Sequence, residues 1–230
     1  MKKIGLIGGV GWPSTIDYYR IINEEANKKL GKLNAPEVIV YSLNFEPFMA
    51  LQYSNKWKQS AEVLAKAALS LEKAGADFVL ICSVTTNVAA NMLQNKINIP
   101  VISIVESVAE AIHKRCVNRV LLLGTKVTME YPFFEPELGA RGIECVVPNK
   151  KDRQIIHDII YRELCHNVVK KESKKKYLKI IKKMQRKGIK GVILACTEIP
   201  MLIEQKDLNI PVFNVSKLHA IKALELALKK

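Results

Sequence analysis

The sequence predicts an α/β protein made of two similar halves, each with a parallel β-sheet covered by helices. The main observation is an apolar segment that occurs twice, at residues 75–83 and 188–196. Each copy opens with a glycine that closes an amphipathic helix, and it continues as the apolar run typical of a buried parallel strand. A nucleophile, Ser83 or Cys196, stands eight residues after the glycine. Ligands of open α/β sheets bind beyond the carboxyl ends of the strands, so both positions are candidates for catalysis.

Other landmarks repeat in the same order. Residues 3–8 resemble residues 119–124, and residues 99–102 resemble residues 210–213. These separations of 116 and 111 residues bracket the 113 residues between Ser83 and Cys196. We interpret the chain as a duplication of one α/β half. Two such halves facing each other would put two proton-transfer groups on opposite sides of one cleft.

The first half is expected to alternate strands with helices, as a parallel sheet requires. Pro13 suits the start of the first helix, and Pro36 ends the loop before the second strand. Gly75 suits the end of a long helix. The expected elements are a strand at 3–8, a helix from about 13 to 29, a strand at 37–43, a helix at 56–74, a strand at 78–81, a short helix at 87–94 and a short strand at 101–103.

The second half is expected to repeat this alternation. Its elements are a helix at 105–114, a strand at 119–123, a helix at 129–140 ended by Gly142, a strand at 144–147, helices at 152–165 and 173–187, strands at 192–194 and 212–214, and a final helix at 216–228. The expected domains are residues 1–99 together with 213–230, and residues 100–212.

The composition is that of a globular protein of 230 residues with 49% hydrophobic residues. No apolar run reaches the roughly 18 residues of a membrane span, and the N-terminus lacks the pattern of a signal peptide. We therefore expect a cytoplasmic protein that does not bind membranes. The five cysteines are scattered without a CxxC pair, and the four histidines lack an HExxH spacing. These patterns predict neither a disulfide framework nor a metal site.

The net charge of +14 raises the possibility of nucleic-acid binding. The basic residues, however, are 29 lysines and only 7 arginines, whereas specific phosphate and base recognition favours arginine. The densest basic run, residues 170–187, alternates lysines with apolar residues as an amphipathic helix does. We therefore expect a solvated helix face and no nucleic-acid partner.

The turn at residues 8–11 follows a strand and opens a helix, which is the context of a dinucleotide-binding loop. Its glycines do not complete the GxGxxG pattern, because Ser14 stands where the third glycine would be. A helix start with free amides also suits a small carboxylate, and we favour that ligand for Gly9, Val10 and Gly11. The alternative is a plain tight turn.

Cys196, Thr197 and Glu198 form the sharpest local motif. A thiol between a strand and a helix start is expected to have its thiolate favoured by nearby amides. Thr197 can hydrogen-bond a ligand carboxylate, and Glu198 can orient or repel a charge. A buried structural cysteine is the alternative, and the repeat with Ser83 favours function over it.

The segment after Ser83 supplies Thr85, Thr86 and Asn87 as hydrogen-bonding groups, or alternatively as helix caps. Strand periodicity points the neighbouring Cys82 to the other face, into the core.

The turn after the strand at 119–123 repeats the context of the first glycine turn. There Thr125, Lys126 and Thr128 are candidates to hold a second anion. Alternatively, the two threonines cap the following helix.

Taken together, these motifs resemble the aspartate/glutamate racemase family, whose members work without pyridoxal phosphate. The segments that carry the resemblance are residues 7–15 with 18–23, residues 124–129, residues 160–164, residues 195–200 and His219. The resemblance implies two α/β domains related by a pseudo-two-fold axis, an active site in the cleft between them, and a homodimer. It implies no cofactor and a small dicarboxylic or other amino acid as substrate. By position in the family, Gln52 is a further substrate-binding candidate.

In this family, two cysteines act on opposite faces of the substrate, and the resemblance implies those roles for Cys196 and Ser83. The first family cysteine stands in a Cys-Asn-Thr-x-His segment, which corresponds here to residues 83–87 with Ser83, Val84 and Asn87 as departures. A serine hydroxyl is far less acidic than a thiol and needs a neighbouring base to act. Two alternatives therefore stay open: a single-thiol decarboxylase or isomerase of the same superfamily, and a catalytically weak amino-acid-binding protein.

Overall fold

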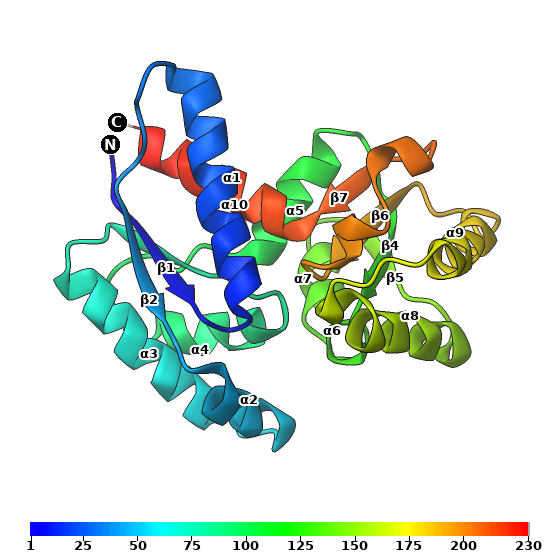
Figure 1. Ribbon diagram of the computed structural model, residues 1–230, viewed down its shortest axis with the longest axis horizontal. Helices are drawn as coiled ribbons and strands as arrows, with labels where there is room; N and C mark the ends of the chain where they lie inside the picture. Colours follow the sequence, from blue (N-terminus) through cyan, green and yellow to red (C-terminus); the bar gives the residue numbers. More distant parts are fainter. Residues whose placement is uncertain (230) are drawn as a thin grey trace. The chain divides into compact units, whose positions relative to one another are not determined.

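The structure is a computed structural model that describes residues 1–229, and the side chain of Tyr53 also lies outside the description. The chain divides into two compact units (Figure 1). Unit 1 contains residues 1–104 and 219–230, and unit 2 contains residues 105–218. The sequence placed these two boundaries slightly earlier, after residues 99 and 212.

Unit 1 contains a parallel sheet of three strands in the order β2-β1-β3. The strands are β1 (Ile4–Gly8), β2 (Val38–Ser42) and β3 (Phe78–Ile81). A single parallel bridge from Val79 to Val101 continues the sheet beyond β3. The helical segments are α1 (Trp12–Leu30), α2 (Phe45–Tyr53), α3 (Trp57–Lys73), η1 (Thr85–Ala89), α4 (Ala90–Gln94) and α10 (Val215–Leu228).

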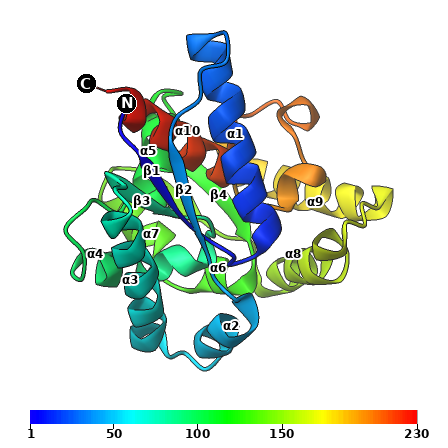
Figure 2. The same ribbon diagram turned by 60° about the vertical axis from the view of Figure 1, so that its left-hand side comes forward.

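Helices cover both faces of this sheet (Figures 1 and 2). On one face, Ile7, Val79 and Ile81 pack with the alanine- and leucine-rich side of α3 and with α4. On the other face, Ile4 and Leu80 pack with α1 and α10. Since the residues of each strand alternate between these two clusters, β1 and β3 are apolar throughout, as the sequence predicted.

Unit 2 contains a parallel sheet of four strands in the order β5-β4-β6-β7. The strands are β4 (Arg119–Gly124), β5 (Glu144–Val146), β6 (Gly191–Ala195) and β7 (Val212–Asn214). The helical segments are α5 (Ile104–His113), α6 (Lys126–Glu130), α7 (Phe134–Gly139), α8 (Lys150–Arg162), η2 (Leu164–His166), α9 (Lys171–Gln185), η3 (Ile199–Met201) and η4 (Gln205–Asp207). The predicted α/β fold with two parallel sheets is confirmed.

Helix α9 is amphipathic along its whole length. Tyr177, Ile180, Ile181 and Met184 are buried in a core shared with α8 and with strands β4 and β6. The opposite face is basic and exposed at positions 171, 175, 179, 182 and 186, which follow one another about one turn apart.

Four local features differ from the expectations. The helix expected at 129–140 is two short helices, α6 and α7, because Pro132 falls between them and proline breaks a helix. The strand expected at 101–103 is a single bridge residue, Val101. Helix α2, after β2, was not predicted, and the helix expected at 87–94 is the 3₁₀ turn η1 followed by α4.

Candidate functional site

Ser83 and Cys196 occupy equivalent places in the two sheets. In unit 1, Ile7 pairs with Ile81, so Ser83 lies one residue beyond the level of Gly8, the last residue of β1. In unit 2, Gly124 ends β4 and pairs with Ala195, so Cys196 lies one residue beyond that level. Each position therefore lies just beyond the carboxyl end of its strand. That strand pairs with β1 in unit 1 and with β4 in unit 2.

The same equivalence extends to the helix ends before these strands. Gly75 has φ of +91° and Gly188 has φ of +89°, a left-handed conformation in which glycine is the least strained residue. Each glycine follows a long helix, α3 or α9, and precedes the strand that ends at the nucleophile. The eight-residue spacing read from the sequence thus corresponds to one shared local structure.

The glycine turn after β1 is tightly built. Gly9 has φ of +75°, and an added Cβ would lie 2.2 Å from the carbonyl oxygen of Leu43. Its N–H donates to Thr15 Oγ1 at 3.0 Å. This amide is occupied, which contradicts the expectation that the whole turn offers free amides to a carboxylate. The side chain of Val10 is buried, so from Val10 and Gly11 the backbone is what the turn can present.

Ser83 lies at the end of a chain of neutral hydrogen bonds. Gln52 Nε2 donates to Thr86 Oγ1 at 3.1 Å, and Thr86 Oγ1 donates to Ser83 Oγ at 3.1 Å. The structure thereby joins Gln52, from α2, to Thr86 and Ser83 in one chain of hydrogen bonds. A hydroxyl that accepts from Thr86 is stabilised in its more negative form, but within residues 1–229 no carboxylate or imidazole is hydrogen-bonded to it to take its proton.

Asn87 hydrogen-bonds to the backbone of the same segment. Its Nδ2 donates to the carbonyl oxygens of Ser83, at 2.6 Å, and Ile81, at 3.1 Å, and its side chain is buried. Asn87 therefore braces the strand end, and Thr86 is buried beside it. Thr85, the first residue of η1, stays half-buried.

Cys196 lies against a carboxylate. Its Sγ donates to Glu198 Oε2 at 2.8 Å, and Thr197 Oγ1 donates to the same oxygen at 2.8 Å. All three side chains are half-buried. One carboxylate oxygen thus holds both the thiol and the hydroxyl of the motif.

These contacts reverse the expected protonation of the thiol. Burial raises the pKa of Cys196 well above its ordinary value, and the negative charge and hydrogen bond of Glu198 raise it further. The backbone N–H of Glu198 opposes the shift but does not overcome it. The expectation that nearby amides favour the thiolate was wrong, because the three-residue turn η3 follows and the effects of burial and of the Glu198 carboxylate outweigh that of the backbone amide.

The neighbouring strand end in unit 2 carries Thr125 and Thr128. Thr128 N–H donates to Thr125 Oγ1 at 3.3 Å, and the two hydroxyl oxygens lie 3.1 Å apart. Thr125 is thus the N-cap of α6, which was the alternative to anion binding. Lys126 N–H donates to His157 Nδ1 at 3.3 Å, so this amide is also occupied.

A family comparison decides what these two strand ends belong to. The profile of the Asp/Glu/hydantoin racemase family matches residues 7–223, which include both of them. The chain belongs to this racemase family.

Solved structures agree with this assignment. An aspartate racemase homologue from Pyrococcus horikoshii OT3 is 40% identical to this chain, with a TM-score of 0.91 and full coverage of both chains. An Asp/Glu racemase-type protein from Yersinia pestis is 37% identical, with a TM-score of 0.96 and full coverage of both. The broad specificity amino-acid racemase of Bacillus subtilis (strain 168) is 22% identical over 220 residues, which are 93% of this chain and 92% of that protein.

Two titratable side chains of this racemase family member were missed as site neighbours. His157 reaches the start of α6 from α8, and Tyr161 lies against its ring at 4.6 Å between centroids. Burial and the Lys126 charge lower the pKa of His157, which favours the neutral ring that accepts from the Lys126 amide. The four-residue spacing of His157 and Tyr161, one face of a helix, was the available signal.

The remaining candidates of this racemase chain are structural. Cys82 is fully buried, which raises its pKa far out of the physiological range and confirms its core role. His219 is also fully buried.

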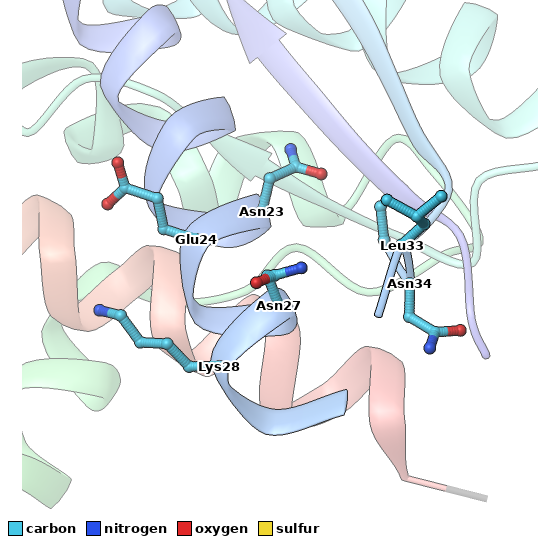
Figure 3. A pocket seen from close by; sticks show the side chains of 7 residues that line it. Asn23, Glu24, Asn27, Lys28, Leu33 and Asn34 are labelled. Atoms are coloured by element: carbon cyan, nitrogen blue, oxygen red, sulfur yellow. The ribbon is translucent and has the colours of Figure 1, made fainter. Parts of the chain in front are cut away.

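The hollow of about 550 Å³ in Figure 3 is lined by Asn23, Asn27 and Asn34 around the C-terminal half of α1. It lies at the opposite end of that helix from the glycine turn.

Within residues 1–229 of this racemase family member, no group of three or more His, Cys, Asp or Glu side chains is arranged to hold a metal ion. No helix in that range is long and apolar enough to cross a membrane.

Proposed function

We propose that this chain is a cofactor-independent amino-acid racemase of the aspartate/glutamate type, in which Cys196 and Ser83 exchange the α-proton on opposite faces of the substrate. The observation that carries the proposal is the contact of 2.8 Å between Cys196 Sγ and Glu198 Oε2, at the strand end equivalent to that of Ser83. Family membership supports the reaction class. The substrate carboxylate would lie against backbone amides and threonine hydroxyls, drawn from Gly11, Thr85, Thr125 and Thr197.

The thiol must first become a base. In the proposed reaction, Cys196 passes its proton along the existing hydrogen bond to Glu198 Oε2, and the thiolate then removes the α-proton. The electron pair left on Cα is protonated from the other face by the Ser83 hydroxyl. Thr86, which donates to Ser83 Oγ, stabilises the negative charge that develops there. Water then takes the proton from Glu198 and returns a proton to Ser83 Oγ, which restores the starting protonation states. In the reverse direction Cys196 is the acid and Ser83 the base, which is the harder step because a hydroxyl is a poor source of a base.

Deuterium wash-in at Cα tests this proposal. Each enantiomer of a panel of amino acids is incubated in D₂O, and the products are read by mass spectrometry and chiral chromatography. Cys196→Ala should lower exchange by about 100-fold or more, the usual contribution of a proton-transfer group. Cys116→Ser, at an exposed thiol, is the matched control and should exchange normally. Normal exchange in the Cys196 variant would overturn the proposal.

A one-base reaction is the second candidate, namely the single-thiol decarboxylase or isomerase. It is favoured by the contrast between the two strand ends, since the Cys196 thiol donates to a carboxylate whereas the Ser83 hydroxyl accepts from the neutral Thr86 hydroxyl. Exchange confined to one enantiomer would identify it. Binding of an amino acid without any exchange would identify the third candidate, a binding protein.

The proposal requires no cofactor and includes a homodimer. Activity should survive metal chelators and carbonyl reagents that trap pyridoxal phosphate, and loss of activity that added cofactor restores would contradict it.

For the dimer, helix α1 presents Trp12, Ile16 and Tyr19 on one exposed face, an apolar stripe of the kind that interfaces cover. Light scattering of the purified chain measures its mass in solution.

A further inference from the structure

The carboxylate of Glu198 has two oxygens in different situations. Oε2 accepts from both Cys196 and Thr197. For Oε1, no hydrogen-bond donor and no cation are found among residues 1–229. The side chain is half-buried, so water hydrates the carboxylate charge only in part.

Three half-buried carboxylates of unit 2 lie against lysines. Asp207 lies 2.7 Å from Lys174 Nζ, and Asp152 lies 2.7 Å from Lys183 Nζ. Glu163 lies 3.4 Å from Lys170 and also accepts from Ser173. A partly buried charge without a cationic partner is costly, so the contrast between these three pairs and Glu198 indicates a place for a cation that residues 1–229 do not supply.

Apart from Glu198, the side chains that are hydrogen-bonded to Ser83 and Cys196 are neutral. Gln52, Thr86 and Ser83 form one cluster, and Cys196 and Thr197 lie against Glu198 in the other. The charge of Lys126, on the neighbouring strand end, acts on His157. A substrate with a second carboxylate would normally be met by an arginine or lysine fork. Among residues 1–229, neither cluster has such a cation in hydrogen-bond contact.

We propose that Glu198 Oε1 binds the ammonium group of the substrate, and that the substrate is an amino acid with a neutral or cationic side chain rather than a dicarboxylic acid. This inference rests on the proposed amino-acid reaction and narrows its substrate class. An ammonium at Glu198 would hold Cα next to Cys196, because the carboxylate already contacts that thiol. A side-chain carboxylate would instead meet an uncompensated negative charge.

The test measures ligand binding at Cys196 without requiring turnover. Cys196 is alkylated with iodoacetamide, an uncharged reagent, and its modification is followed by peptide mass spectrometry with and without glutamine, lysine or glutamate. Glutamine and glutamate have the same shape and differ in charge, so their comparison isolates the charge. Glutamine or lysine should protect at about tenfold lower concentration than glutamate, the scale of one charge-assisted hydrogen bond.

Glu198→Gln should remove this preference, and Glu198→Asp should retain part of it. Glu172→Gln removes an exposed carboxylate from α9 and should leave the preference unchanged. Each protection factor is a ratio within one variant, which cancels changes in the reactivity of the thiol. Equal or better protection by glutamate, no protection by any of the three, or an intact preference in Glu198→Gln would overturn the inference. Protection in the expected order without proton exchange would overturn the proposed reaction and leave the binding assignment standing.

Discussion

The phenol oxygen of Tyr18 lies 2.9 Å from Nδ1 of His219, and Nε2 of the same ring lies 2.9 Å from the carbonyl oxygen of Ile102. Because a carbonyl can only accept, Nε2 carries the proton and Nδ1 accepts from Tyr18. The neutral ring therefore ties α1, α10 and the segment before α5 together within unit 1. A second proton would leave Nδ1 unable to accept from the tyrosine.

This buried ring predicts acid sensitivity. Burial lowers the pKa of His219 from 6.5 to about 4, so between these values the unfolded chain binds a proton that the folded chain does not. The free energy of unfolding should therefore fall as pH drops from about 6.5 to 4, by about 3 kcal/mol for this group. Urea unfolding at several pH values measures it. His219→Gln should flatten the slope in this window, whereas His113→Gln, at an exposed histidine, should not.

The thiol of Cys196 should react slowly at neutral pH. Its raised pKa means that the thiolate is scarce, so iodoacetamide should modify Cys196 more slowly than an exposed thiol and speed up with increasing pH. Glu198→Gln removes the negative charge beside the thiol and should shift the alkylation profile to lower pH. Glu172→Gln should leave the profile in place. Fast modification of wild-type Cys196 at pH 7 would contradict the protonated thiol.

Ser83→Cys should strengthen the weaker face of the proposed reaction. A thiol supplies a base that a hydroxyl does not, so deuterium wash-in at that face should rise by about tenfold or more and the two directions should become more alike. Ser83→Ala is the matched control and should not raise exchange. Equal, fast wash-in of both enantiomers in the wild type would mean that Ser83 is no handicap. An unchanged rate in Ser83→Cys would mean that position 83 does not face the substrate.

Gly9→Ala should destabilise the chain by about 1–3 kcal/mol or more. The substitution combines a left-handed backbone with a clash between the new Cβ and the Leu43 backbone. Gly139→Ala is the control, because a Cβ there meets nothing within 4 Å and the residue ends a helix. Alanine favours helices, so the control should be neutral or stabilising by up to about 1 kcal/mol. Similar losses in both variants, measured by urea unfolding, would contradict the packing argument.

The strands follow from sequence patterns, whereas the order of the strands within each sheet was not predicted. The apolar runs at β1, β3, β4 and β6 fit only buried parallel strands, and Gly75 and Gly188 end helices because of their backbone freedom. Pro132 marks the break between α6 and α7 in the sequence, but the helix expected at 129–140 did not take this proline into account. Helix α2 was missed because its short apolar stretch has no distinct helical period.

The candidate site was predictable in its residues but not in its hydrogen bonds. The predicted strand ends identified Ser83 and Cys196 as candidates. The hydrogen bonds from Gln52 to Thr86 and from Thr86 to Ser83 depend on contacts between segments that are distant in the sequence. The state of the thiol depends on which oxygen of Glu198 it meets, and spacing along the chain does not specify that. His157 reaches Lys126 across 31 positions, a contact that no local pattern encodes.

Most of the net positive charge of the chain lies on the lysine-rich helix α9 and the residues that flank it. Residues 170–190 contain eleven of the 36 basic residues and one of the 22 acidic ones, so +10 of the total +14 lies in this segment. An electric dipole results, and a charged surface or an approaching anion exerts a torque that turns this helix toward it. Retention on a cation exchanger therefore reports the orientation of one face rather than the average charge, and reversing two or three of its lysines should change elution more than the same change spread over the rest of the chain.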